Sequence, residues 1–319
     1  MAYAQGTATG VNDLMAKINA FCVSQGWVVN RYVLPQTGQP GVIMSIQKGT
    51  QFVNFRSFVN ESLFQLGTVN PSNFTGIGVY GSDGYSSNAF WSEQPGGSHM
   101  PGKNSLGFFS NLTLPITQYY FFSYPDIDEI HLIIQYTPGN YQYMGFGKLK
   151  PFGSDMDARW YAGSVAGSFN FLQTGKDAWS YDDAPLFPFR NSCRDRSNVS
   201  FDDQCASGLR VKAQNIDTWY RDKGNQAFSS ACYDYHLERI VRAPTGWQSR
   251  LLPNVIFAAS ADKASCMPMG EIKHLRRMAG IANYTDTEEF ALGSDTWKVF
   301  PYHSRSFSGD SGYAVRKVI

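Results

Sequence analysis

Helical spacing of apolar residues is clear at only one place in this 319-residue chain. Within residues 11–25, Leu14, Ile18 and Phe21 recur at intervals of three and four residues, and Gly26 stands where a helix would end. Through most of the rest of the chain, apolar residues form short runs or alternate with polar ones, separated by Gly, Pro, Asn and Asp. The pattern therefore predicts a mainly β protein with one N-terminal α-helix.

The composition agrees with a β-rich fold. Aromatic residues make up 15% of the chain and Gly occupies 30 positions, which favours strands and turns over long helices. Charged residues make up 17%, below the roughly 25% of an average globular protein. A surface left bare in water normally carries more charge. We therefore expect partner subunits to cover much of the exterior.

Several strands can be placed by residue number. Two apolar runs, 41–46 and 51–58, are separated by a turn and predict a hairpin. In the run 141–149, Gly145 and Gly147 alternate with larger side chains, which indicates a bulge or a close backbone approach. Residues 288–292, 296–301 and 312–318 predict a three-stranded meander. The remaining predicted strands are 27–33, 76–80, 118–123 and 129–136.

Other stretches are irregular. Residues 81–104 are rich in Gly, Ser and Pro and nearly free of aliphatic side chains. We expect them to form a long surface loop that is mobile in the free protein and becomes ordered on neighbouring subunits. Residues 264–278 fit either one helical turn or an extended connector.

The domain organisation follows from these stretches. We expect a helix and a β-sandwich part in residues 1–150 and an irregular, loop-rich segment in 151–260. The C-terminal β-meander in 261–319 would complete one compact unit. The predicted fold is thus β-sandwich-like, with one N-terminal α-helix and long ordered loops.

The sequence favours neither a nucleic-acid partner nor a membrane. The net charge is +1, and the one dense basic run, Lys273, His274, Arg276 and Arg277, fits a solvated helical face at least as well as a phosphate-binding patch. No stretch approaches the ~18 apolar residues that span a bilayer. The first residues also lack the basic and apolar regions of a signal peptide. We expect a soluble protein that is made in a bacterial cytoplasm.

No metal or cofactor is predicted. The five cysteines include no C-x-x-C pair, so we expect reduced, mostly buried thiols, although a disulfide between Cys193 and Cys205 stays open. His131 lies in a β run and is interpreted as a core or cross-strand residue. Gly76-Ile77-Gly78 is not followed by a helix, as a nucleotide-binding loop would be. No two histidines have the spacing of a local metal-ligand pair: His99, His131, His236, His274 and His303.

One motif resembles a catalytic one. Gly309-Asp310-Ser311-Gly312 is similar to the nucleophile motif of chymotrypsin-like serine proteases, in which a Ser is activated by a His and a buried Asp. The motif lies close to the end of the chain, before the further strands that such a protease needs, and no Ala-Ala-His-Cys segment precedes it. We interpret it as a polar hairpin loop between the last two strands.

Pairs of carboxylates leave two further alternatives open. Glycosidases hold two carboxylates roughly 5–10 Å apart across a sugar, and Ca²⁺ sites also use clustered carboxylates. Adjacent Asp residues in turns are, however, usually solvated or cap the backbone. We therefore predict no catalytic residues. The pairs are Asp126/Asp128/Glu129, Asp155/Asp157, Asp182/Asp183 and Asp202/Asp203.

Three stretches together resemble a known family. The first is the helical segment 11–26 with Trp27, which follows a very short N-terminal arm. The second is Tyr136-Thr137-Pro138-Gly139-Asn140-Tyr141-Gln142-Tyr143-Met144-Gly145-Phe146-Gly147-Lys148-Leu149-Lys150-Pro151-Phe152-Gly153. The third joins Gly270-Glu271-Ile272-Lys273 and Arg276-Arg277-Met278 to residues 293–301, Gly-Ser-Asp-Thr-Trp-Lys-Val-Phe-Pro. In combination they are similar to virion structural proteins of tailed bacteriophages.

The resemblance covers the ends and the middle of the chain, and residues 155–250 poorly. It implies a structural, non-enzymatic component of the virion, in the tail, baseplate, tail tip or collar, without catalytic residues. Its partners would be copies of itself, in a symmetric oligomer, and other virion structural proteins. Abundant aromatic side chains suit a permanent subunit interface. The alternatives are a virion protein that binds host-surface glycans and an enzyme that degrades polysaccharide.

Overall fold

The computed structural model describes residues 1–61, 74–91, 93–95, 107–109, 112, 114–152, 160–165, 210–212, 226–229, 250–259, 266–279, 281, 284–301 and 311–317. Within these ranges the chain forms one α-helix and 17 strands, which confirms the mainly β class and the N-terminal helix.

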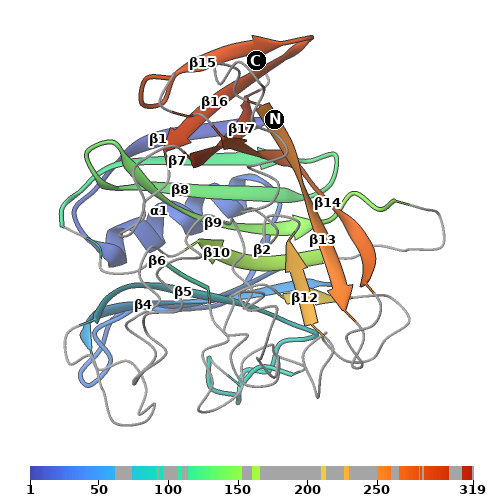
Figure 1. Cartoon of the computed structure of the whole chain (residues 1–319). Helices are drawn as coiled ribbons and strands as arrows, with labels where there is room; N and C mark the ends of the chain where they lie inside the picture. The colour runs from blue at the N-terminus through green and yellow to red at the C-terminus, as the bar shows by residue number, and fades with distance from the viewer. Residues whose placement is uncertain are drawn as a thin grey trace, which may run out of the picture.

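The strands form three sheets in which all pairs are antiparallel (Figure 1). The central sheet contains, in spatial order, β1 (Ala2–Ala8), β7 (Ile116–Tyr124), β8 (Glu129–Thr137), β9 (Asn140–Lys148), β10 (Trp160–Val165) and β11 (Arg210–Lys212). The N-terminal sheet contains β2 (Val28–Val33), β3 (Ile43–Lys48), β4 (Gln51–Glu61), β5 (Phe74–Ser82) and β6 (Gly107–Phe109). The C-terminal sheet contains β12 (Gln226–Ser229), β13 (Arg250–Ala259), β14 (Cys266–Ala279), β17 (Ser311–Lys317), β16 (Asp295–Pro301) and β15 (Glu289–Leu292).

The central sheet is buried on both faces. Because successive side chains of a strand point to opposite faces, Phe121 and Leu132 pack with the N-terminal sheet, while Phe122 and Ile133 pack with the C-terminal sheet. Strand β7 therefore reads as a nearly continuous aromatic run instead of an alternating one. The predicted sandwich is in this way extended to three stacked layers.

Helix α1 (Val11–Ser24) fills the space between the central and N-terminal sheets. Leu14, Ile18 and Phe21, the residues that predicted the helix, are buried, and the ring of Phe21 lies 5.5 Å from that of Phe121. Gly26 follows with a φ of +81°, a conformation that favours glycine, so the predicted end of the helix is confirmed.

Most of the predicted strands are present. Strands β3 and β4 form the expected hairpin, and β15, β16 and β17 form the expected C-terminal meander. For residues 264–278 the sequence predicts either one helical turn or an extended connector. The structure shows the long strand β14 at 266–279. Strand β1 was not predicted. It pairs with β7 at the edge of the central sheet.

Residues 83–91 and 93–95 form a loop, as predicted, but part of this loop packs on its own chain. Trp91 is 4% exposed and packs edge-on against Phe58 and Tyr80 of the N-terminal sheet. The buried side chain of Gln94 bonds to the backbone of residues 86, 89 and 90. One aromatic ring and one amide thus hold this part of the loop on its own chain without any aliphatic residue. Residues 96–104 lie outside the described ranges.

Much of the predicted irregular segment 151–260 also lies outside the described ranges. Strands β10 to β13 are its described parts. Cys193 and Cys205 are not among the described residues, so their pairing stays open. Cys22 is a buried free thiol, as expected, and burial raises its pKa.

Gly147 marks a close backbone approach, one of the two alternatives that the sequence predicted, whereas Gly145 makes room for a side chain. A Cβ atom on Gly147 would lie 2.5 Å from the Cα atom of Glu129, and the φ of Gly147 is +146°. A Cβ atom on Gly145 would lie 2.2 Å from the hydroxyl of Tyr143. The bulge between β8 and β9 falls elsewhere, between Gln135 and Thr137. Strand β9 therefore packs directly against the start of β8.

Replacing Gly147 with Ala should destabilise the protein more than replacing Gly139 with Ala. Gly139 also has a positive φ, of +77°, but a Cβ there would meet nothing within 4 Å. The Gly139→Ala control should cost about 1–2 kcal/mol for its backbone conformation. The overpacking at Gly147 should add roughly 1–3 kcal/mol. Urea unfolding of both variants measures the difference, and equal losses would contradict the close approach.

Candidate functional site

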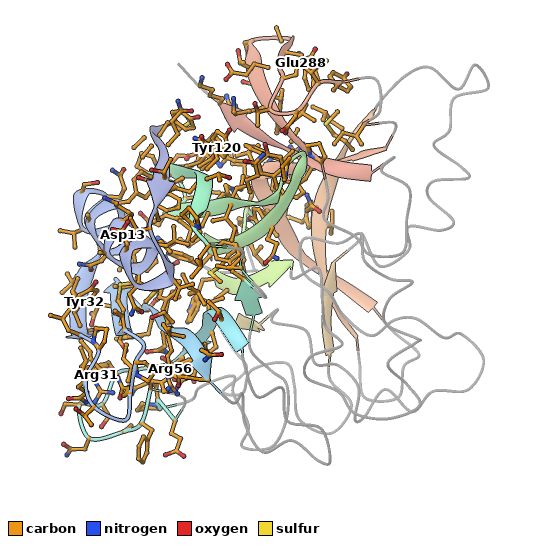
Figure 2. The ribbon with its side chains drawn as sticks, turned by 90° about the vertical axis from the view of Figure 1, so that its left-hand side faces the viewer. Asp13, Arg31, Tyr32, Arg56, Tyr120 and Glu288 are labelled. Atoms are coloured by element: carbon orange, nitrogen blue, oxygen red, sulfur yellow. The ribbon has the colours of Figure 1, made fainter. Side chains whose placement is uncertain are left out.

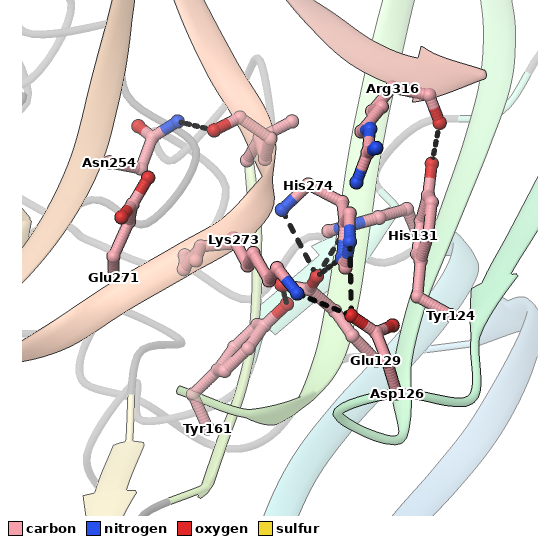
Figure 3. Close-up of polar contacts among 12 residues, drawn as sticks. Tyr124, Asp126, Glu129, His131, Tyr161, Asn254, Glu271, Lys273, His274 and Arg316 are labelled. Atoms are coloured by element: carbon pink, nitrogen blue, oxygen red, sulfur yellow. Dashed lines mark hydrogen bonds and ion pairs between the residues drawn. The ribbon is translucent and has the colours of Figure 1, made fainter. Parts of the chain in front are cut away.

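The largest group of ionisable side chains in the described core lies between the central and C-terminal sheets (Figure 3). We call it the Glu129 network, which consists of Glu129, His131, Tyr143, Tyr161 and His274. Glu129 and His131 are two residues apart on β8, so both point toward the C-terminal sheet. Strand β14 supplies His274 from the other side. The network thus joins the two layers.

The carboxylate of Glu129 is fully buried and bound on both oxygens. Its Oε2 atom lies 2.7 Å from His274 Nδ1 and accepts a second hydrogen bond from the backbone N–H of His274, at 3.2 Å. The hydroxyl of Tyr161 donates to Oε1 at 2.9 Å. Glu129 is 0% exposed, so these protein donors take the place of water.

His131 completes the buried part of the network. Its Nε2 atom lies 3.5 Å from Glu129 Oε2, and its Nδ1 atom is hydrogen-bonded to the hydroxyl of Tyr143. A neutral ring that carries its proton on Nε2 lets Nδ1 accept from Tyr143 and turns its N–H toward Glu129 Oε2. The prediction that His131 is a core residue is confirmed.

Asp126 and Lys273 connect the network to the surface. His274 Nε2 lies 3.5 Å from Asp126 Oδ2, and Lys273 Nζ donates to the same oxygen at 2.5 Å. The Asp126 side chain is 46% exposed. The ring of Tyr124 stacks on the His274 imidazole at 3.8 Å, and its hydroxyl donates to the backbone oxygen of Arg316 (Figure 3). Three separate segments, residues 124–129, 273–274 and 316, are thereby tied together around His274.

The electrostatics keep Glu129 ionised. Burial by itself raises the pKa of Glu129, but the charge and hydrogen bond of His131 and the hydrogen bond of His274 outweigh it and lower this pKa to about 2. Burial also lowers the pKa of His131, although Glu129 opposes the shift. At neutral pH the network therefore holds a carboxylate and a neutral His131 ring.

Asp128 lies in the same turn between β7 and β8 as Asp126 and links the central sheet to the N-terminal sheet. It binds Lys148 of β9 at 2.7 Å and Lys48, at the end of β3, at 2.8 Å. These hydrogen bonds and charges overcome the effect of burial and lower the pKa of Asp128. The predicted turn position of Asp126 and Asp128 is confirmed. The other carboxylate pairs, and His99, His236 and His303, lie outside the described residues.

The interpretation of the basic run as a solvated helical face is wrong. Lys273, His274 and Arg276 belong to strand β14. The His274 side chain is buried, Arg276 pairs with Glu271 at 2.7 Å, and its guanidinium lies over the ring of Trp297. Closely spaced basic residues resemble a helical face in sequence, but adjacent residues of a strand point to opposite sides, so His274 can enter the core while Lys273 does not. The ladder between β13 and β14 also shifts register between residues 272 and 276, so Arg276 does not follow His274 into the core.

The protease-like motif begins the last strand. Ser311 and Gly312 are the first residues of β17, while 309 and 310 lie outside the described residues. A Cβ atom on Gly312 would lie 2.0 Å from Ile281 Cδ1 and 2.5 Å from the backbone oxygen of Phe300. Close packing of the strand therefore explains the glycine. Gly76 and Gly78 also lie within a strand, β5, as the absence of a following helix indicated.

Sequence reasoning missed the Glu129 network. The available signal was the pair Glu129 and His131, two ionisable residues on one face of an otherwise apolar strand. Their partner His274 lies 145 residues from Glu129 in the sequence. Glu129, His274 and Asp126 form a carboxylate–imidazole–carboxylate series, an arrangement that can move protons. Here the inner carboxylate, Glu129, is buried, and both of its oxygens already accept hydrogen bonds from the protein. What this arrangement does directly is hold two sheets in register.

The stability of the protein should fall as the pH falls below about 6.5. The lowered pKa of His131 makes the unfolded chain bind a proton that the folded chain does not bind. The lowered pKa of Glu129 gives stability that is present above 4.5 and is lost as the pH falls toward 2. Glu129 alone should account for about 3 kcal/mol. Denaturant unfolding at a series of pH values measures this loss.

Glu129→Gln tests the assignment. This variant should be roughly 3–5 kcal/mol less stable at pH 7, because buried donors lose their anionic acceptor, and its stability should depend less on pH below 4.5. Glu93→Gln is the control, because it makes the same change at a glutamate that is exposed on the surface. Equal pH dependence in wild type and Glu129→Gln would contradict the role of the network.

Comparison with known proteins gave no relative: no protein-family model matches the chain, and no curated protein matches it. Among the described residues, no group of three or more His, Cys, Asp and Glu is arranged to hold a metal ion. No helix in that part of the chain is long and apolar enough to cross a bilayer.

Proposed function

We propose that the chain is a structural, non-enzymatic subunit of the virion of a tailed bacteriophage. It would stand in the tail, baseplate, tail tip or collar and assemble as a symmetric oligomer. The observation that carries the proposal is the complete burial of the Glu129 carboxylate within its network. A catalytic acid or base must come within hydrogen-bond distance of a substrate, whereas both oxygens of Glu129 are bound by protein donors out of contact with solvent.

The packing between the three sheets supports a structural role. Rings from the central and C-terminal sheets pack edge to face between the layers, as where Phe300 lies 5.2 Å from Tyr120 and 5.3 Å from Tyr141. Between the same two sheets, the ring of Tyr313 lies 5.2 Å from that of Tyr143. Such aromatic pairs add roughly 0.5–1.5 kcal/mol each beyond the area that they bury. Together with the buried Glu129–His274 contact, they favour a rigid subunit over one that opens to admit a substrate.

The resemblance in residues 11–27, 136–153, 270–273, 276–278 and 293–301 supports the virion assignment. The expected partners are copies of the chain and other virion structural proteins, and the expected location is the particle. Low charge and exposed apolar side chains are typical of surfaces that a subunit interface covers. Phe90, for example, is 74% exposed.

Quantitative mass spectrometry of purified particles tests the proposal. The protein should be present after density-gradient purification, in more than one copy per particle, because a symmetric oligomer requires several identical subunits. A non-structural protein of the same phage, followed through the same gradient, is the control for contamination. Loss of the chain from the particles on purification, or a single copy in each, would count against it.

A separate assay tests the alternative that the chain is a polysaccharide-degrading enzyme. Purified protein incubated with host capsular or cell-wall polysaccharide should release no reducing ends. Release that disappears in Asp126→Asn would instead support a polysaccharide-degrading enzyme, since Asp126 is the solvent-facing carboxylate of the site.

A further inference from the structure

Two edge strands of the molecule expose apolar side chains. Among the described strands, β2 is outermost in the N-terminal sheet and β15 is outermost in the C-terminal sheet. Val28 and Leu34, at the two ends of β2, are 58% and 64% exposed, and Leu292 of β15 is 56% exposed. Neither strand contains a proline. Edges of this kind are templates for pairing with another chain.

The hydrogen-bond register shows which backbone groups β15 leaves free. The N–H of Val299 donates to the backbone oxygen of Glu288, at 2.9 Å. Because bonded and non-bonded pairs alternate in an antiparallel ladder, Phe290 and Leu292 turn their backbone groups toward β16. Glu289 and Ala291 turn theirs away from it. The outer edge of β15 thus offers an alternating row of donors and acceptors to a further strand.

The two edges lie in the two outer layers, on opposite faces of the central sheet. In Figure 2, Glu288 lies at the top of the molecule, whereas Arg31 and Tyr32 of β2 lie at its lower left. One copy can therefore offer β15 to the β2 of a second copy while its own β2 stays free for a third. A contact of this kind is head to tail, and it closes a ring when the rotation between copies allows.

The charges beside the two edges are opposite. Asp286 and Glu288 stand just before β15, the first exposed and the second half-buried. The Asp286 carboxylate accepts from the hydroxyl of Tyr141, and the Glu288 carboxylate accepts from the backbone N–H of Thr285. The guanidinium of Arg31 in β2 donates to the backbone oxygens of Ser87 and Ala89, and within the described residues no carboxylate pairs with it. Pairing β15 with β15, or β2 with β2, would bring like charges together, whereas pairing β15 with β2 brings opposite charges together.

From these observations we infer that copies of this chain assemble head to tail by β-strand addition, the outer edge of β15 in one copy pairing with the outer edge of β2 in the next. The inference rests on the proposed oligomer and names its contact surface. Backbone hydrogen bonds would supply affinity, and Leu292 would pack beside Val28 or Leu34.

Cysteine crosslinking on the assembled full-length protein tests this contact. Val28→Cys, Leu34→Cys and Leu292→Cys place thiols on exposed positions of the two edges, where they should not disturb folding. With a short bismaleimide, a mixture of Leu292→Cys with either Val28→Cys or Leu34→Cys should give dimers, and the double variant that joins the same two positions should give a ladder of multimers. Each single variant alone should stay uncrosslinked, which also controls for the native cysteines.

A second variant removes one backbone donor. Ala291→Pro deletes an outward-facing N–H without breaking the ladder between β15 and β16, so the protein should fold normally but lose its oligomers in native mass spectrometry. Ala291→Val keeps the donor and is the matched control. It should assemble like the wild type.

The outcomes separate this inference from the proposed function. Crosslinking of Leu292→Cys alone would indicate a two-fold contact and overturn the head-to-tail arrangement. An oligomer that persists in Ala291→Pro, with no crosslink in either double variant, would overturn the strand pairing but leave a virion subunit in place. Absence from purified particles would overturn the proposed function, whatever the crosslinking shows.

Discussion

Burial of the central sheet on both faces is the constraint on which the rest of the structure depends. Strands β7, β8 and β9 place large apolar residues on each face, so neither face can be left to water. Helix α1 and the N-terminal sheet cover one side, and the C-terminal sheet covers the other. The outer sheets in turn bury their own inner faces against the same strands. Each layer is therefore needed by its neighbour.

Two ionic contacts fix how the layers sit on one another. Asp128 binds Lys48 and joins the central sheet to the N-terminal hairpin, while Glu129 binds His274 and joins it to the C-terminal sheet. A buried carboxylate costs several kcal/mol unless its partners are well placed. The Glu129 network therefore penalises any shift of β14 along β8 more sharply than apolar contacts would. This restraint, and the burial of Glu129, are the basis on which a structural role is proposed.

Local patterns predicted the parts of the fold in which neighbouring residues carry the information. Leu14, Ile18 and Phe21 specify α1, since a helix repeats its apolar face within a few residues. Gly147 indicated the close approach because only a residue without Cβ fits there. The packing of the loop after β5 on its own chain was not predicted, because it depends on one ring, Trp91, whose contacts come from strands earlier in the chain.

The sequence by itself determined the strand-rich class, the single described helix, the main hairpin and the C-terminal meander. Each of these depends on periodicity and turn residues within a short window. Only the tertiary structure decided that the sheets stack in three layers and that His274 enters the core beside Glu129. The stacking and the burial of His274 both depend on which strands meet across the sheets. A contact between residues 145 positions apart produces no periodic pattern in the sequence from which it could be predicted. The same holds for the two free edges, because a strand becomes an edge only when the whole sheet is assembled.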